Sequence, residues 1–316
     1  MQKYNTAKAA TRDVGNEYVD LMAADENLYV VNADLSDSLK IRKAKNAYPG
    51  RTIEMGISEQ DMISFSYGLA LMGKKVIVNT FAQFMQRGWD QIYQSGRGKK
   101  LNIIYRATHA GIGVGQDGES AQAIGDLGAM RANAGIDYVL DPVDYNEAVE
   151  LLRQLLQENR TAYMRTYRQP VSPLLPQNYE PKIGRGFLFP QNINSSIIII
   201  ASGSMLEQAL KAQSLLESSG IKIKVAALST IKPSPDAGEV KRLVENSNLV
   251  ITAEDHLKYG GGLGDALAPA LNKLGIRQKR IGMDSYGTTG TPEGLYKKYG
   301  MDAEGITRQV KEFLNK

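Results

Sequence analysis

The sequence contains no cysteine and only two histidines among its 316 residues. The lack of cysteine excludes disulfides, thiol catalysis and thiolate metal ligands, and His109 and His256 alone are too few for a histidine-rich metal site. Long apolar runs are also lacking, since the most apolar one, at 197–200, is far too short to span a bilayer. Residues 1–5 begin no apolar signal region. We therefore expect a cytoplasmic protein that does not bind a membrane.

Positive charge is in small excess over negative charge. The net charge of +4, without a dense stripe of Lys and Arg, predicts no binding to nucleic acid. A content of 42% hydrophobic and 23% charged residues is ordinary for a soluble globular protein. The length of the chain suggests two domains.

Short β-rich runs alternate with amphipathic helical stretches from end to end. We predict strands at 28–31, 75–78, 101–105 and 162–164 and, after a break, at 197–201, 223–228, 249–252 and 278–281. Helices are predicted at 59–71, 84–94, 120–133 and 145–158 and at 205–218, 237–245, 264–274 and 303–313. This alternation predicts an α/β fold with two domains, each a mostly parallel sheet flanked by helices. Prolines clustered at 169–190 indicate a linker, which divides the chain into domains at 1–168 and 191–316.

Three segments of the first half point to a function. Met-Gly-Ile-Ser-Glu-Gln-Asp-Met occupies 55–62, Thr-Phe-Ala-Gln-Phe occupies 80–84, and a glycine-rich segment, Thr-His-Ala-Gly-Ile-Gly-Val-Gly-Gln-Asp-Gly, occupies 108–118. In this order and spacing they resemble the pyrimidine-binding half of transketolase. In the second half, Ser-Thr-Ile-Lys-Pro at 229–233, Ala-Glu-Asp-His at 253–256 and Gly-Gly-Gly-Leu-Gly at 260–264 resemble the transketolase C-terminal domain.

The other half of that family's active site is absent, since no Gly-Asp-Gly occurs in the sequence. In the family this element binds the Mg²⁺ and the diphosphate of thiamine diphosphate. The resemblance therefore implies the C-terminal subunit of a split transketolase, an enzyme that moves a two-carbon ketol unit from a ketose phosphate to an aldose phosphate with thiamine diphosphate. Its partner is expected to be an N-terminal subunit that supplies the Mg²⁺ ligands, in an α2β2 heterotetramer. We expect no metal ligand on this chain.

The resemblance implies a cofactor role for three residues. Glu59 is expected to hydrogen-bond the aminopyrimidine ring of the cofactor as the catalytic carboxyl, with Ser58 as the helix N-cap before it. Phe81 is expected to stack on that ring, and Phe84 to complete the apolar wall. The structural alternatives are a first-turn carboxylate favoured by the helix dipole and two ordinary core aromatics.

Further matches imply a site for a sugar phosphate. His109 and Arg168, with Arg12 and Ser38, match positions that bind the terminal phosphate in the family, and arginine suits that anion because its planar fork makes paired, charge-assisted hydrogen bonds. Asp117 matches an aspartate that bonds a substrate hydroxyl. The glycines at 111, 113 and 115 are expected to let the backbone approach a ligand. The alternatives are a structural histidine, a plain turn at Asp-Gly and surface arginines.

Some positions leave the reading open. Many transketolases have a histidine where this chain has Ala121, so the substrate contacts near the chemistry are in doubt. Arg165 is either a further phosphate ligand or part of a structural ion pair. Glu254, Asp255 and His256 are expected to stabilise the second domain or an interface.

Four alternatives remain beside the leading hypothesis. The chain could belong to a transketolase for an unusual ketose, such as a branched sugar phosphate or a sulfosugar. It could be the E1 β subunit of a 2-oxo acid dehydrogenase, although that subunit lacks the glycine-rich loop as written here. A 1-deoxyxylulose-5-phosphate synthase half and a non-catalytic assembly subunit are the other two. The sequence does not identify the donor, the acceptor or the partner chain.

Overall fold

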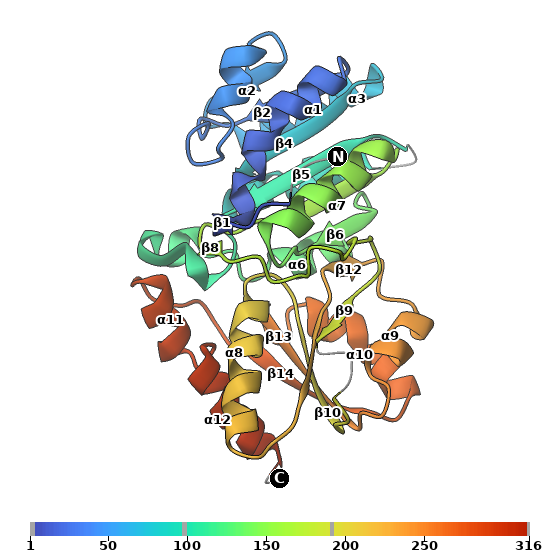
Figure 1. Ribbon diagram of the computed structural model, residues 1–316. Helices are drawn as coiled ribbons and strands as arrows, with labels where there is room; N and C mark the ends of the chain where they lie inside the picture. Colours follow the sequence, from blue (N-terminus) through green and yellow to red (C-terminus); the bar gives the residue numbers. More distant parts are fainter. Residues whose placement is uncertain (1–3, 97–99, 190–192, 315–316) are drawn as a thin grey trace.

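A computed structural model of the chain describes residues 4–96, 100–189 and 193–314. The N-terminal domain lies above the C-terminal domain, and each is built around one main sheet (Figure 1). Among the described residues the first sheet has seven strands in the order β12-β6-β7-β5-β4-β2-β3, and the second has five in the order β14-β13-β10-β11-β9. Within these two sheets all pairings are parallel except β12 with β6 and β9 with β11. The predicted α/β fold with two mostly parallel sheets is confirmed.

The elements of the N-terminal domain begin with β1 (Ala9–Ala10) and the 3₁₀ helix η1 (Thr11–Glu17). The other strands are β2 (Leu28–Asn32), β3 (Thr52–Glu54), β4 (Lys75–Phe81), β5 (Ile103–Thr108), β6 (Tyr138–Leu140), β7 (Thr161–Arg165) and β8 (Pro170–Val171). The helices are α1 (Tyr18–Ala24), α2 (Arg42–Ala47), α3 (Glu59–Leu71), α4 (Ala82–Met85), η2 (Gln86–Gly88), α5 (Trp89–Ser95), η3 (Ile112–Asp117), η4 (Glu119–Ala121), α6 (Asp126–Ala132) and α7 (Tyr145–Gln157).

The second part of the chain follows the same alternation. Its strands are β9 (Phe187–Phe189), β10 (Ile197–Ala201), β11 (Lys224–Ala227), β12 (Thr230–Lys232), β13 (Leu249–Leu257) and β14 (Arg277–Met283). Its helices are α8 (Met205–Ser218), α9 (Ala237–Leu243), α10 (Leu263–Lys273), α11 (Pro292–Lys298) and α12 (Ala303–Leu314). None of the helices in the described ranges is long and apolar enough to cross a membrane.

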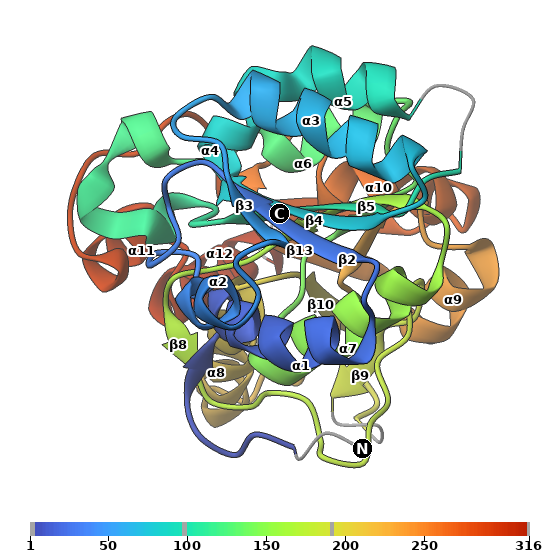
Figure 2. The same ribbon diagram turned by 90° about the horizontal axis from the view of Figure 1, so that it is seen from above.

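Helices cover both faces of the first sheet. Helices α1, α2 and α7 lie on one face, and α3, α5 and α6 lie on the other (Figure 2). The central strands are therefore buried on both sides, and Val76, Ile77 and Val78 of β4 are fully inaccessible, as expected for a parallel strand without alternating polarity. Helix α7 begins where the side chain of Asp144 accepts a hydrogen bond from the Glu147 N–H (2.9 Å), a standard N-cap.

Two predicted helices are wrong in extent. The helix predicted at 84–94 is divided into α4, η2 and α5, and Gly88 at the break lies so close to Ile63 that a Cβ there would come within 2.1 Å of Ile63 Cδ1. The helix predicted at 120–133 begins only at Asp126. The buried Gln122 side chain instead bonds the Gly287 N–H (2.8 Å) and the Thr288 carbonyl (3.0 Å) of the other domain. The strands β3, β6, β9 and β12 and the helices α1, α2 and α11 were not predicted.

One short strand of the second half of the chain joins the sheet of the first half. Strand β12 follows the predicted linker in sequence but joins the first sheet through β6. Within the predicted linker, β8 pairs with β1 and β9 pairs with β11. Residues 190–192, where the second domain is predicted to begin, lie outside the described residues, so the domain limits stay a prediction.

Candidate functional site

The sequence-predicted site residues gather at one edge of the first sheet. Phe81 is the last residue of β4, Ser38 follows β2, and Glu59 follows β3 as the first residue of α3. His109 comes directly after β5, and Arg168 follows β7. Because the strands β7, β5, β4, β2 and β3 are parallel neighbours, their carboxyl ends meet at the edge where α/β folds bind ligands.

The polar members of this group contact one another. Arg12, on η1, directs one guanidinium nitrogen to His109 Nε2 (3.2 Å) and to the main-chain oxygen of Ser38 (3.4 Å). Arg168 pairs with the Asp117 carboxylate (3.6 Å), and both side chains are about 40% exposed. Four of the predicted phosphate-site residues therefore lie within one cationic cluster, and Asp117 lies at its exposed side. Their roles stay predictions.

His109 is neutral in this cluster. Burial, followed by the charges of Arg12 and Arg168, lowers the pKa of His109 to about 3. Since a guanidinium only donates hydrogen bonds, the Arg12 contact assigns Nε2 as the acceptor and places the ring proton on Nδ1. Among the described residues that buried Nδ1 has no hydrogen-bond partner, nor has the buried Nε of Arg12. The site thus holds buried donors and positive charge, which suit an anion.

The aromatic residues of the site stack on one another and on His109. The ring of Phe81 is 9% exposed and lies on the imidazole of His109, with centroids 3.9 Å apart and planes 21° apart. Its centroid is 5.2 Å from that of Phe84, which is only half-buried. His109 itself has a positive φ of 58°, a backbone conformation that is uncommon outside glycine. Phe84 therefore presents the more accessible ring of the pair.

Glu59 is buried at the first position of α3, with 7% of its surface exposed. Within the part of the chain that the structure describes, no hydrogen bond or ion pair reaches its carboxylate. Ser58 occupies the predicted N-cap position, but its hydroxyl donates to the Met55 carbonyl (2.9 Å) and makes no hydrogen bond to the helix. Most of the residue is buried, but its carboxylate oxygens keep some exposure and have no internal partner, so they are open to a ligand that donates a hydrogen bond.

The glycine-rich loop after β5 faces the C-terminal domain. A Cβ at position 111 would lie 2.0 Å from the carboxylate of Asp255, and one at 113 would lie 2.8 Å from the hydroxyl of Tyr296. The missing Cβ atoms at Gly111 and Gly113 therefore make room for protein atoms of the C-terminal domain, and the approach of this loop to a ligand stays a prediction. The sequence indicated Asp255 only as a stabilising residue and gave no signal for Tyr296.

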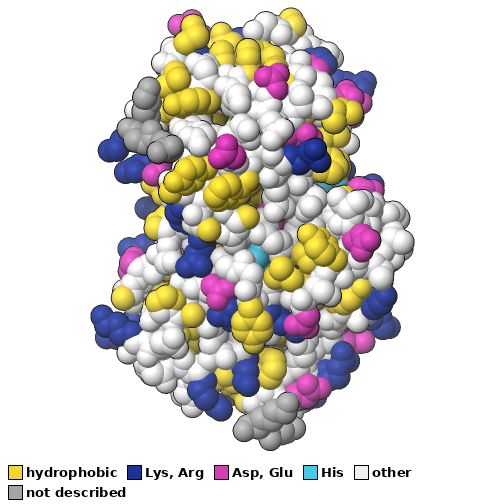
Figure 3. Space-filling model, turned by 180° about the vertical axis from the view of Figure 1, so that it is seen from behind, with side chains coloured by type: hydrophobic (Ala, Val, Ile, Leu, Met, Phe, Trp, Pro, Cys, Tyr) yellow, Lys and Arg dark blue, Asp and Glu magenta, His cyan; other side chains and the backbone are white. Residues whose placement is uncertain are grey.

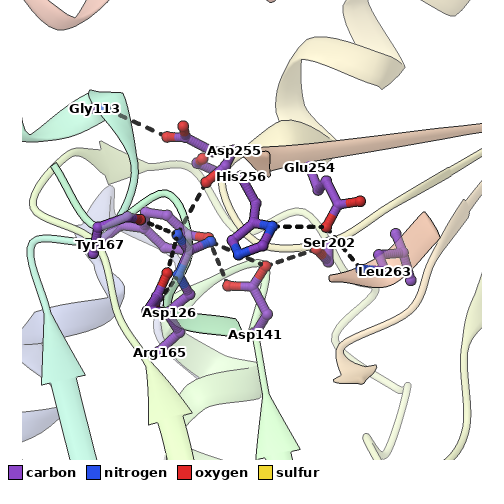
Figure 4. Close-up of polar contacts among 12 residues, drawn as sticks. Gly113, Asp126, Asp141, Arg165, Tyr167, Ser202, Glu254, Asp255, His256 and Leu263 are labelled. Carbon is purple, nitrogen blue, oxygen red and sulfur yellow. Dashed lines mark hydrogen bonds and ion pairs between the residues drawn. The ribbon is translucent and has the colours of Figure 1, made fainter. Parts of the chain in front are cut away.

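Arg165 is part of a structural ion pair, which settles the alternative left open by the sequence. It is fully buried and makes two hydrogen bonds to the Asp126 carboxylate (2.9 and 3.0 Å). Its remaining donors bind the Tyr167 hydroxyl (3.0 Å), the Ala123 carbonyl (2.6 Å) and the Asp255 carbonyl (3.0 Å). These groups come from both domains and converge on one guanidinium (Figure 4). Because Arg165 is fully buried among these partners, it is not accessible to a substrate phosphate.

Ala121 is buried in the single turn η4 and is 4% exposed. Its methyl group offers no hydrogen bond to a ligand, as the sequence indicated. No group of three or more His, Asp or Glu side chains that could hold a metal ion occurs in the described ranges.

Comparison with known proteins identifies the class. Residues 7–173 match the model of the transketolase pyrimidine-binding domain, and residues 190–306 match that of the transketolase C-terminal domain. The chain belongs to the transketolase family, and the resemblance drawn from its motifs is confirmed.

Three individual similarities make this more specific. A Methanocaldococcus jannaschii protein named as a transketolase C-terminal section is 33% identical over 98% of this chain and 97% of its own length. The 6-deoxy-6-sulfo-D-fructose transketolase subunit SqwH of Clostridium sp. (strain MSTE9) is 30% identical over 93% of this chain and 92% of its own length. A solved structure described as a split gene transketolase, an inactive beta4 tetramer, superposes with a TM-score of 0.85 at 31% identity and covers 96% of this chain and 97% of that one. By contrast, the chain spans about half the length of the human and mouse transketolases that it matches.

Proposed function

We propose that this chain is the C-terminal subunit of a two-chain transketolase, which transfers a two-carbon ketol unit from a ketose phosphate to an aldose phosphate. The observation that carries the proposal is the cationic cluster of Arg12, His109 and Arg168 at the same sheet edge as Glu59 and the Phe81–Phe84 pair. This arrangement places a site for an anion next to a site for an aromatic ring. The nearly full-length similarity to a transketolase C-terminal section and to a split gene transketolase supports a two-chain enzyme.

The cofactor proposed for this site is thiamine diphosphate, which supplies the nucleophilic carbon that takes up the ketol unit. The described residues fit its ring end: Glu59 is a mostly buried residue whose carboxylate accepts no internal hydrogen bond, and Phe84 offers a half-buried aromatic face. Glu59 would bond the aminopyrimidine ring and hold or share its proton. The diphosphate and Mg²⁺ are assigned to the partner subunit, because the described chain offers no acidic cluster for a metal.

An exposed apolar surface beside Glu59 suits that partner. Ile57, Phe65 and Met72, on or next to α3, are 82%, 38% and 77% exposed. Trp89, at the start of the neighbouring α5, is 37% exposed. Hydrophobic side chains are frequent over the N-terminal domain on the face seen from behind (Figure 3). Contiguous exposed apolar residues mark interaction surfaces, so we place the N-terminal subunit here and expect an α2β2 heterotetramer.

A sulfosugar is the second candidate substrate. A sulfonate would use the same cluster of donors as a phosphate, and one full-length relative is the sulfofructose transketolase subunit. Ala121 also leaves the sugar contacts open to change. Donor assays with xylulose 5-phosphate and with 6-deoxy-6-sulfofructose decide between them.

The experiment is reconstitution with an N-terminal subunit that carries Gly-Asp-Gly and a downstream Asn. We expect ketol transfer from xylulose 5-phosphate to ribose 5-phosphate only with both chains, and light scattering should give an α2β2 mass. The Glu59→Gln variant should assemble, but its kcat should fall by roughly 100-fold or more. Asp61→Asn is the matched control, an exposed carboxylate in the same helical turn. Ketol transfer by this chain alone, or submicromolar binding of thiamine diphosphate to it in calorimetry, would refute the two-chain reading.

A further inference from the structure

The loop that joins His109 to Asp117 is held by a carboxylate from the other domain. Asp255, fully buried on β13, accepts hydrogen bonds from the main-chain N–H of Ile112 (2.9 Å) and Gly113 (3.3 Å). Figure 4 shows this carboxylate directed at Gly113. The loop therefore takes its backbone position from a residue of the C-terminal domain, more than 140 positions away in the sequence.

Two side chains orient Asp255 in turn. The Tyr296 hydroxyl, on α11, donates to its carboxylate (2.8 Å) and is also bonded to Ser204 (3.0 Å). Arg165 donates to its main-chain oxygen (3.0 Å). Burial raises the pKa of the Asp255 carboxyl, whereas the charge of Arg165 and the N–H groups of the loop lower it. The carboxylate is thus the common acceptor of three buried donors.

The shape of the loop matches this contact. Gly111 has a φ of 73°, and its missing Cβ leaves the space that the Asp255 carboxylate occupies. Gly113 likewise leaves room for Tyr296, and the Gly115 Cβ position is 3.2 Å from Pro292. At the far end of the loop the Thr289 hydroxyl donates to the Gln116 carbonyl (2.8 Å). The C-terminal domain therefore contacts the loop along its length.

We propose that Asp255 is a positioning residue for substrate binding, through which the C-terminal domain fixes the loop that carries His109 and Asp117. The inference rests on the proposed function, because it assigns that loop to the sugar phosphate. It gives the C-terminal domain a direct part in substrate affinity. It also gives a reason for the glycines at 111 and 113, where a Cβ would meet Asp255 and Tyr296.

The test compares two neighbouring carboxylates. Glu254 is a matched control, because it too is buried and accepts two main-chain hydrogen bonds, from Leu263 (2.7 Å) and Gly264 (3.0 Å), but only within its own domain. In the reconstituted enzyme, Asp255→Asn should raise KM for xylulose 5-phosphate about tenfold with little change in kcat, since an amide cannot accept all three hydrogen bonds. Glu254→Gln should leave KM unchanged. Equal KM values for the two variants would overturn the proposal.

A second measurement on the chain alone is independent of catalysis. We expect the Ile112 and Gly113 amides to exchange hydrogen at least tenfold faster in Asp255→Asn than in Glu254→Gln, because only the former loses their acceptor. Inorganic phosphate should shift the His109 imidazole resonance in the unchanged chain and in Glu254→Gln but only weakly in Asp255→Asn. Unchanged exchange, or an unchanged phosphate titration, would contradict a positioning role.

The KM comparison and the measurements on the chain alone distinguish a failure of the proposed function from a failure of the role proposed for Asp255. If the unchanged complex shows no ketol transfer, the proposed function fails, while amide exchange and phosphate binding still decide the role of Asp255. If Asp255→Asn does not fold, Tyr296→Phe replaces it, because that variant removes one hydrogen bond and keeps the carboxylate. Its KM should then rise, but by less than tenfold. A Tyr296→Phe enzyme with the original KM and loop exchange would overturn the proposal.

Discussion

Replacing Asp126 by Asn should strongly destabilise the chain. The Asp126 carboxylate accepts two hydrogen bonds from Arg165 and one from the Tyr163 hydroxyl (2.6 Å), and all three side chains are buried. Removing one partner of a buried ion pair costs about 3–5 kcal/mol, because the remaining charge is left uncompensated. Asp141 stays 3.8 Å from the Arg165 guanidinium and offsets part of that charge. We therefore expect a loss of about 3 kcal/mol, at the lower end of this range.

The loss is measured by urea unfolding followed by circular dichroism. The control is Asp284→Asn, which breaks an ion pair to Lys258 (2.8 Å) whose carboxylate is 77% exposed, and exposed pairs contribute about 0–1 kcal/mol. A loss in Asp126→Asn no larger than in the surface control would refute the assignment of Arg165 to a buried ion pair.

The other predictions concern the anion cluster. Arg168→Ala and His109→Ala should each raise KM for phosphorylated donors by the equivalent of about 1.5–3 kcal/mol and leave kcat less affected, because a remote anion is bound alike in the ground and transition states. The control Arg277→Ala, at an exposed position on β14, should not raise KM. If all three variants discriminate equally between xylulose and its phosphate, the anion site lies elsewhere. Neither His109 nor His256 should titrate between pH 5 and 8 in the chain without an anion, because their pKa values are lowered to about 3 and about 4 by burial first. Both imidazoles protonate only in the unfolded chain, so their contribution to stability is present above the unfolded pKa of about 6.5 and is lost as the pH falls toward 4; a histidine NMR resonance with a midpoint near 6.5 would contradict this.

The elements that the sequence predicted best have their signal within a few residues. Strand β4 shows it as consecutive β-branched residues that parallel neighbours bury on both faces, and α7 shows it as an N-cap at Asp144 followed by leucines at helical spacing. The motifs around Glu59, Phe81 and His109 are also local, and each follows a strand of the first sheet. Because these strands are parallel and close together in the sheet, the motifs meet at one edge.

The elements that the sequence did not predict depend on distant partners. Strand β12 is three residues long and is stabilised by pairing with β6, about 90 positions earlier in the chain, so no local pattern distinguishes it from a loop. The start of α6 was misplaced because Gln122 bonds to residues 165 and 166 positions away. Ser58 was read as a cap from its position, but its hydroxyl has a competing acceptor three residues earlier. In the first two cases tertiary contacts outweigh local preference, and in the third a local acceptor competes with the helix.

The contacts divide the candidate site into two ends that depend on different parts of the assembly. At the anion end, Arg12 contacts His109, and Asp255 of the same chain accepts a hydrogen bond from the loop that follows His109. These contacts form without a second subunit. At the ring end, Glu59 has no internal partner in the described residues, and the same helix continues into exposed apolar side chains. Exposed apolar surface is unfavourable in an isolated chain, and the Glu59 carboxylate has no hydrogen-bond donor from its own chain in the described residues. Association with a partner and its cofactor would cover the surface and supply the donor, and for that reason the ring end, not the anion end, should depend on the second subunit.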